Sequence, residues 1–383
     1  MNNRVAIIRC EQYNLEEVYQ ALSEAVDATG DFNVQGKRVL LKPNIVSDSH
    51  PDKAITTHPV FLEAAIRLAK ERGAARIMVG ESPGLHTSSF YGKHSGIGEV
   101  CRRTGVEWRD FLAGKAELPC PQGKAVKSVT VTDAIRDADV LISLPKLKTH
   151  QLMLFTGAMK NCFGLIPSMM KSASHVRFPR IGDFAAFLVD IVLAAKPGYA
   201  LMDGIVGMEG PGPGSGTPRQ LSLVLASSNL LAMDIAASAI VGYPPLEVPM
   251  NREALSRQVW LKNLEEVEYP LLSPEAVAVP DWEKIPLKKE GRQLLEMALP
   301  RSYRKFRERL TPRPVVNQEV CRRCGDCVRI CASRALTLKG DGKDQRIHLD
   351  YTACIRCYCC HEICPYHAID IQKVPLGTAL FGS

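Results

Sequence analysis

The sequence contains no long hydrophobic run. No apolar stretch approaches the about 20 residues that a membrane-spanning helix requires, so the pattern predicts no transmembrane segment. The first 17 residues are polar and carry no apolar region of the kind found in secretory signals. Because the chain nevertheless holds 13 cysteines, we expect a reducing compartment and therefore a cytoplasmic protein.

Two common nucleotide-binding patterns are also missing. The chain has neither a P-loop lysine pattern nor a G-x-G-x-x-G at a strand-to-helix turn. Its net charge of +7 is modest, and much of it lies between Lys288 and Arg313, where Tyr303 and Phe306 interleave with cations. Such a stretch suits a membrane surface, an acidic partner or nucleic acid. We favour a solvated connector helix and expect no nucleic-acid partner.

Length and composition predict a soluble globular chain of several domains. A chain of 383 residues, 46% hydrophobic, is long enough for two or three domains with full cores. Proline-rich segments near residue 270 and at 311–314 mark the domain edges. The predicted units are an α/β domain at 1–285, a basic helical linker at 286–314 and a small ferredoxin-type α+β domain at 315–374.

Eight cysteines form two blocks of identical spacing near the C-terminal end. Each block reads C-x2-C-x2-C-x3-C, the ferredoxin spacing in which three cysteines bind one [4Fe-4S] cluster and the fourth binds the other cluster. Zinc is the alternative because it also uses C-x2-C pairs, but it leaves the third cysteine of each triplet unexplained. A disulfide framework is more remote. The predicted ligand sets are Cys321, Cys324, Cys327 and Cys364 for one cluster, and Cys354, Cys357, Cys360 and Cys331 for the other.

The other five cysteines have no metal-ligand spacing. Cys359 stands beside a predicted ligand and is interpreted as a spare thiol. Cys162 lies near the polar run at 160–161, but isolated cysteines are most often buried apolar groups, and we expect core packing for it.

Residues 1–241 alternate between strand and helix patterns. This order predicts a parallel or mixed sheet covered by helices on both faces, that is, an α/β fold. The expected strands are 5–9, 38–41, 76–79, 139–144, 199–202 and 221–226, and the main expected helices are 15–28, 59–73, 181–195 and 229–241.

Polar and charged residues follow several of these strands. In open α/β sheets, ligands bind beyond the carboxyl ends of the strands, so we expect one crevice there. Lysines near a helix start favour an anionic ligand. The candidate catalytic residues are His58, His150, Lys146, Lys148, Lys160 and Asp203, and the candidate substrate-binding residues are Lys42, Asn44, Glu81, Asn161 and Arg219.

The segment Gly207 to Pro218 is rich in glycine and proline. It reads GMEGPGPGSGTP and is interpreted either as a mobile flap over the crevice or as a plain surface loop.

Five short runs carry a resemblance to a known family. They are LKPN at 41–44, GES at 80–82, LPKLKTH at 144–150, GAMKNCFG at 157–164 and DGIVGMEGPGPGSG from Asp203. Together they resemble the bacterial and archaeal family called domain of unknown function 362, and the C-terminal part is similar to dicluster ferredoxin domains, a fusion that recurs in that family. The resemblance implies that the polar runs share one site, without assigning their roles.

Three functions remain open. In the first, the chain is an iron-sulfur oxidoreductase whose two [4Fe-4S] clusters exchange electrons with a small anionic substrate or cofactor in the α/β domain, supplied by a redox partner such as a ferredoxin. His58 or His150 would then deliver protons, and Lys146 and Lys148 would stabilise charge. In the second, it is an electron carrier or assembly factor without substrate chemistry. In the third, the clusters are structural beside a non-redox hydrolase or transferase.

Overall fold

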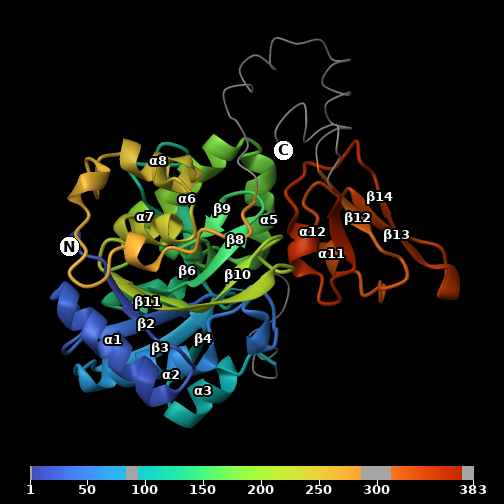
Figure 1. The fold of residues 1–383 in the computed structure, drawn as a ribbon. Coiled ribbons are helices and arrows are strands. Elements are labelled where there is room, and N and C mark those ends of the chain that lie inside the picture. The colour runs from blue at the N-terminus through green and yellow to red at the C-terminus, as the bar shows by residue number, and fades with distance from the viewer. Residues whose placement is uncertain (1, 83–93, 286–311, 373–383) are drawn as a thin grey trace.

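The computed structural model describes residues 2–82, 94–285 and 312–372. A mixed, mostly parallel sheet forms the centre of the large domain (Figure 1). Its strand order is β1 (Ala6–Arg9), β11 (Thr217–Ser227), β10 (Tyr199–Glu209), β7 (Val140–Leu144), β2 (Arg38–Pro43), β3 (Arg76–Glu81) and β4 (Glu107–Asp110). Strands β10, β7, β2, β3 and β4 run parallel, whereas β1 and β10 each pair antiparallel with β11. The predicted α/β class is confirmed.

Both faces of this sheet are covered, as the apolar strands require. Leu40 packs in one hydrophobic cluster, while its neighbours Val39 and Leu41 pack in the other, because successive strand side chains point to opposite faces. Helices on one face are α1 (Leu15–Thr29), α2 (Pro59–Glu71) and α3 (Ile97–Thr104); those on the other include α6 (Ile181–Ala195), α7 (Leu230–Ile240) and α8 (Pro249–Ser256).

Three smaller pieces complete the large domain. Strand β8 (Lys146–His150) pairs with β10 and with β9 (Leu154–Thr156), so the run predicted at a strand end is itself a strand. Two short helices follow, α4 (Ala158–Asn161) and α5 (Ser168–Arg177). A separate hairpin is formed by β5 (Lys115–Pro119) and β6 (Ser128–Thr132).

The described part of the C-terminal domain contains two antiparallel strand pairs and two one-turn helices. Strand β12 (Arg313–Val316) pairs with β15 (Ile369–Gln372), and β13 (Leu336–Lys339) pairs with β14 (Arg346–Leu349). The helices are α11 (Asp326–Ile330) and α12 (Cys359–Ile363). Strand β12 therefore begins inside the predicted linker, most of which, 286–311, lies outside the described residues together with its basic stretch.

The segment interpreted as a flap or loop is a turn between two strands of the central sheet. Its ends belong to β10 and β11, and the tip, 210–216, is the turn. This tip reaches the C-terminal domain: His361 Nε2 lies 3.3 Å from the Pro211 carbonyl oxygen, and His367 Nδ1 lies 3.3 Å from Ser215 Oγ. Figure 1 shows α12 facing the large domain at this place. The tip is thus a loop, as one of the two interpretations had it, and it contacts the C-terminal domain.

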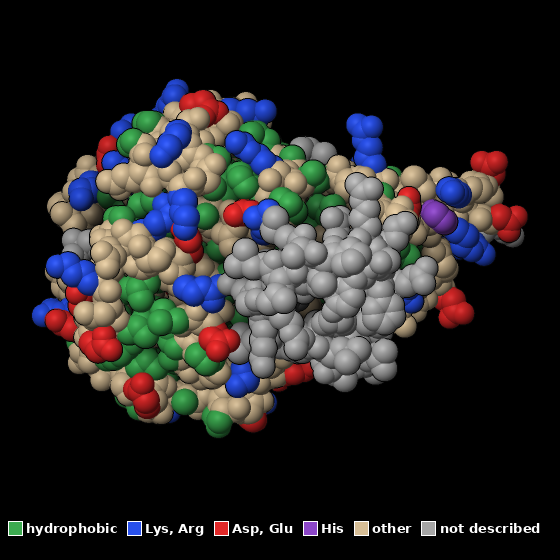
Figure 2. Space-filling view, turned by 90° about the horizontal axis from the view of Figure 1, so that it is seen from above, with side chains coloured by type: hydrophobic (Ala, Val, Ile, Leu, Met, Phe, Trp, Pro, Cys, Tyr) green, Lys and Arg blue, Asp and Glu red, His purple; other side chains and the backbone are tan. Residues whose placement is uncertain are grey.

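Charge is mixed on the surface seen from above. Figure 2 shows Lys and Arg side chains interspersed with Asp and Glu over the described part of that face. Over the three described ranges, no helix is both long and apolar enough to cross a membrane.

Candidate functional site

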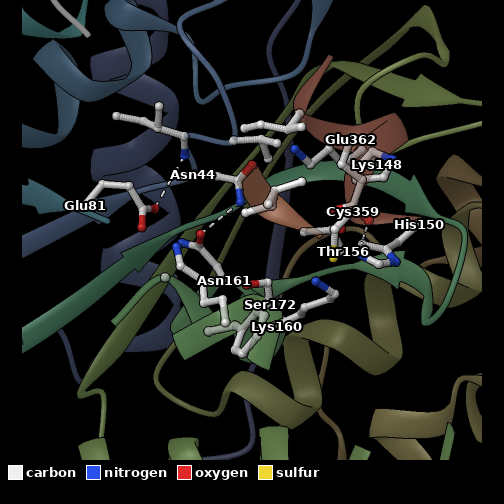
Figure 3. A pocket seen from close by; sticks show the side chains of 18 of the residues that line it. Asn44, Glu81, Lys148, His150, Thr156, Lys160, Asn161, Ser172, Cys359 and Glu362 are labelled. Atoms are coloured by element: carbon white, nitrogen blue, oxygen red, sulfur yellow. Dashed lines mark hydrogen bonds and ion pairs between the residues drawn. The ribbon is translucent and has the colours of Figure 1, made fainter. Parts of the chain in front are cut away.

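A cavity of about 130 Å³ lies where the two domains meet (Figure 3). The α/β domain supplies residues from the ends of β2 and β3, from β8 and from helices α4 and α5, while the C-terminal domain supplies α11 and α12. Six predicted site residues line it: Asn44, Glu81, Lys148, His150, Lys160 and Asn161.

A buried network behind this cavity contains Lys42. Its Nζ lies 2.5 Å from Glu81 Oε2 and 3.1 Å from Asn161 Oδ1, and both Lys42 and Glu81 are almost completely buried. Asn161 Oδ1 also accepts from Asn44 Nδ2 at 3.0 Å. Lys42 therefore does not line the cavity. It neutralises Glu81 and orients Asn161, and both of these residues line the cavity.

Three lysines give the cavity its positive character. Lys148 Nζ donates to the Ile55 carbonyl at 2.5 Å, and Lys171 Nζ donates to the Ser82 carbonyl. Lys160 Nζ lies 5.6 Å from the centre of the Phe163 ring and has no hydrogen bond or ion pair within the described ranges. Burial lowers the pKa of all three, to about 8 for Lys171. Each ammonium group thus retains unused N–H donors, and a bound anion would favour its charged form.

His150 is held as a neutral hydrogen-bond donor. Its Nδ1 accepts from the backbone N–H groups of Leu152 and Met153 at 3.1 and 3.3 Å, so the ring proton lies on Nε2. Burial and neighbouring cations lower its pKa well below the usual value. The Nε2–H group points toward Glu362 Oε1, 3.5 Å away on α12.

Besides Lys42, four other predicted site residues do not line the cavity. Lys146 Nζ lies 2.9 Å from Asp203 Oδ2 and 2.6 Å from the Tyr13 hydroxyl, in a separate buried cluster. His58 stacks on Tyr13, with ring centres 3.5 Å apart, and its backbone N–H donates to Asp203. Arg219 pairs with Asp281 at the surface. The expected single crevice is therefore two clusters, and the irregular pairing of β8 with β10 explains why Lys146 and Lys148 diverge.

Sequence reasoning missed a group on α5. Lys171, Ser172 and His175 line the cavity, and burial lowers the pKa of His175 to about 3. No motif marked this helix, because a lysine in a short polar helix usually faces solvent.

The cysteine blocks share one backbone shape. Left-handed φ values recur at equivalent places, at Arg323 and Arg356, at Gly325 and Tyr358, and at Arg334 and His367. The N–H groups of Ala335 and Ala368 donate to Cys331 Sγ and Cys364 Sγ at 3.2 and 3.3 Å. Such N–H to sulfur bonds stabilise thiolates, so the residues fit an iron-sulfur cluster.

The cysteines also group in space. Cys321, Cys324, Cys327 and Cys364 surround one small, mainly apolar cavity. In the part of the chain that the structure describes, no set of three or more His, Cys, Asp or Glu forms a site for a single metal ion. Thiols arranged around a space, rather than converging on a point, suit a cubane better than a zinc ion. The grouping around this cavity matches the first of the two proposed ligand sets.

The wall contributed by the C-terminal domain adjoins the proposed cluster ligands. Ile330 precedes Cys331, and Cys359, Glu362 and Ile363 are within two residues of Cys360 or Cys364; all four line the cavity. The residues that line the cavity from this domain are thus close in sequence to the proposed cluster ligands. By contrast, Cys162 is buried, and burial raises the pKa of its thiol to about 12, which fits the expected packing role.

Comparisons with known proteins found a similar sequence and similar structures. Over 308 residues the chain is 29% identical to a thylakoid-associated protein of Synechocystis sp., covering 79% of this chain and 93% of that protein. A Thermotoga maritima crystal structure is similar at 15% identity and TM-score 0.33, covering 55% of each chain. The lactate racemase apoprotein of Thermoanaerobacterium thermosaccharolyticum is similar at 11% identity and TM-score 0.35, covering 62% of this chain and 57% of that one. The alignments thus span little more than half of the two solved chains.

Two family models match the chain. One, described as domain of unknown function (DUF362), matches residues 39–239, and the other, described as a 4Fe-4S dicluster domain, matches residues 320–368. The expected two [4Fe-4S] clusters are thereby confirmed. The chain belongs to the family of domain of unknown function 362 and carries a C-terminal dicluster ferredoxin-type domain.

Proposed function

We propose that this protein is an iron-sulfur oxidoreductase that exchanges electrons with a small anionic substrate held in the cavity between its domains. The observation that supports this proposal is that the α/β domain and the cluster domain line the same cavity. Residues next to the proposed cluster ligands, among them Ile330 and Cys359, line the same cavity as Lys148 and Lys160. A protein that only carries electrons has no need of buried lysines beside its clusters.

The clusters would supply or accept one electron each, so a bound substrate gains or loses two electrons in all. Reduction then also requires two protons. The lysines with lowered pKa values are better placed to give them than His58, which lies outside the cavity, or His150, whose neutral ring serves to orient. Their remaining positive charge stabilises negative charge on the substrate.

A ferredoxin-type domain also implies a redox partner protein that loads or unloads the clusters. The expected cytoplasmic location stays a prediction, since the Synechocystis relative is described as thylakoid-associated.

The test is anaerobic reoxidation. Clusters are reduced with dithionite or a partner ferredoxin, small carboxylates and phosphorylated metabolites are added, and cluster absorbance and electron paramagnetic resonance are followed without oxygen. We expect at least one compound to reoxidise the clusters in the parent protein and not in Lys160→Met. If none does, while cluster-ligand variants abolish function in the cell and Lys160→Met leaves it intact, the protein is a carrier or assembly factor.

A further inference from the structure

The cavity contains a hydrogen-bond acceptor whose orientation is fixed. Asn161 Nδ2 donates to the Lys42 carbonyl and to Ser143 Oγ, each at 3.0 Å, and its Oδ1 faces the Lys42 ammonium group. An ammonium group only donates, so Asn161 cannot be turned around. Asn44 must then present its Nδ2 to Asn161 Oδ1, as observed at 3.0 Å. Its own Oδ1 is left as an acceptor.

That acceptor has no partner among the residues that the structure describes. Asn44 Oδ1 is buried without a hydrogen bond, although Asn44 is 8% exposed and lines the cavity. Thr156 Oγ1, on a residue that is 3% exposed and also lines the cavity, is likewise buried and without a partner. Leaving such a group unsatisfied costs about 1–3 kcal/mol, so both atoms indicate a polar ligand.

The rest of the lining requires that ligand to be an anion. Lys148, Lys160 and Lys171 face the cavity, whereas Glu81 is neutralised by Lys42 and only Glu362 remains to oppose them. Lys160 and Thr156 lie on one side of the view in Figure 3 and Asn44 on another. The ligand therefore meets Lys160 and the Thr156 hydroxyl on one side and a pure acceptor, Asn44 Oδ1, on another.

We propose that the substrate is a small carboxylate that also carries a hydroxyl or amine, whose O–H or N–H donates to Asn44 Oδ1 while the carboxylate binds Lys160 and Thr156. This inference rests on the proposed function for the location of the site and adds the substrate class. The volume sets the size: a cavity of about 150 Å³ holds a benzene molecule, so about 130 Å³ accommodates about six non-hydrogen atoms.

The experiment measures binding, not turnover, on anaerobically purified, cluster-loaded full-length protein. Calorimetry compares pairs that differ only by a hydroxyl donor, namely glycolate with acetate and 3-hydroxypropionate with propionate. β-Alanine with propionate tests the amine, which also adds a positive charge. We expect the donor-bearing member of at least one pair to bind about tenfold more tightly or better, since one unpaired buried acceptor is worth about that factor. Equal affinity within every pair, or no binding by any compound, overturns the inference.

Two variants assign the preference to its atoms. Asn44→Leu removes the acceptor while Asn161 keeps its bonds to Lys42 and Ser143, so the two members of a pair should bind within about twofold of each other. Lys160→Met should weaken both members by similar factors and preserve their ratio. A preference that survives in Asn44→Leu overturns the inference. A compound that binds with the expected preference but never reoxidises the clusters contradicts the proposed function alone.

Discussion

Glu362 of the cluster domain lies 3.5 Å from His150 of the α/β domain, measured from Oε1 to Nε2. Both side chains line the cavity, so the interface between the domains and the wall of the site are the same structure. Because His150 Nδ1 already accepts two backbone N–H groups, its Nε2–H can only donate across the interface. The contact needs an acceptor on α12, and not specifically a charge.

This contact predicts a difference between two substitutions of Glu362. Glu362→Gln keeps an acceptor oxygen and should preserve the docking, whereas Glu362→Ala removes it and leaves a buried donor on His150. We expect the alanine variant to open the interface about tenfold more often, from a loss of about 1–2 kcal/mol. Hydrogen exchange of the backbone at 210–216 and in α12 measures this. Equal exchange in both variants would show that the His150 contact does not hold the domains together.

The second prediction concerns the crossed ligand sets. Cys331→Ala and Cys354→Ala should each lose the same cluster, so the double variant should keep about half of the iron, as each single variant does. Cys331→Ala combined with Cys321→Ala should lose nearly all of it. Iron and acid-labile sulfide analysis after anaerobic purification gives the result.

The matched control for this series is Cys359→Ser, at a buried cysteine next to Cys360 that belongs to neither proposed set. It should keep the full iron content. If instead the pair Cys331 and Cys321 behaves as a single cluster, each block binds its own cluster and the ligands do not cross.

The third prediction concerns the buried ion pair behind the cavity. Lys42→Met leaves the Glu81 carboxylate buried without its partner and should lower the free energy of unfolding by about 3–5 kcal/mol. The Glu81 carboxylate is also tightly packed by the backbone of Gly164, where an added Cβ would lie 2.1 Å from Glu81 Oε1. The unpaired carboxylate therefore has little room to move toward water. Denaturant unfolding followed by tryptophan fluorescence reports on the large domain, since Trp108, Trp260 and Trp282 all belong to it.

An exposed pair serves as the control. Arg4→Met breaks the Arg4 to Glu268 pair, whose side chains are 48% and 68% exposed, and should cost at most about 1 kcal/mol. The double variant Lys42→Met, Glu81→Gln should recover part of the loss. A cost for Lys42→Met as small as that for Arg4→Met would mean that water reaches Glu81.

Part of this site was predictable from the sequence because parallel strands end at a common edge. Lys42 and Glu81 close the neighbouring strands β2 and β3, so polar residues at both ends had to meet. The cysteine spacing likewise predicted the cofactor, because this spacing is typical of the thiols that bind a pair of [4Fe-4S] clusters.

The remainder depended on tertiary structure. Their position after the expected strand at 139–144 suggested that Lys146 and Lys148 act together. The shift in the pairing of β8 with β10 instead sends Lys146 to Asp203 and Lys148 to the cavity. Nothing in the sequence indicated that side chains of α5 and α12 would line the cavity. Whether a lysine on a short helix is buried, and which residue of another domain faces it, is decided by packing between segments distant in sequence.

The last prediction concerns pH. The pKa of Lys171 is lowered to about 8, mainly by burial. Of the charged groups that face Lys171, Glu81 raises this pKa, and Lys42 and Lys160 lower it. Below pH 8 the ammonium form predominates and attracts an anion; above it the neutral amine does not. A bound anion favours the charged form, so binding takes up a proton at higher pH.

We therefore expect the affinity for a small carboxylate to be nearly constant at pH 6–7 and to fall as pH rises through about 8, approaching tenfold per pH unit if Lys171 alone titrates. Lys171→Gln should bind more weakly at pH 7 and lose the step near pH 8, whereas Lys127→Gln, at an exposed lysine, should retain it. Calorimetry in two buffers of different ionisation enthalpy measures the proton uptake directly. A step that persists unchanged in Lys171→Gln would assign it to Lys148 or Lys160, whose pKa values burial also lowers, and would remove Lys171 from the anion site.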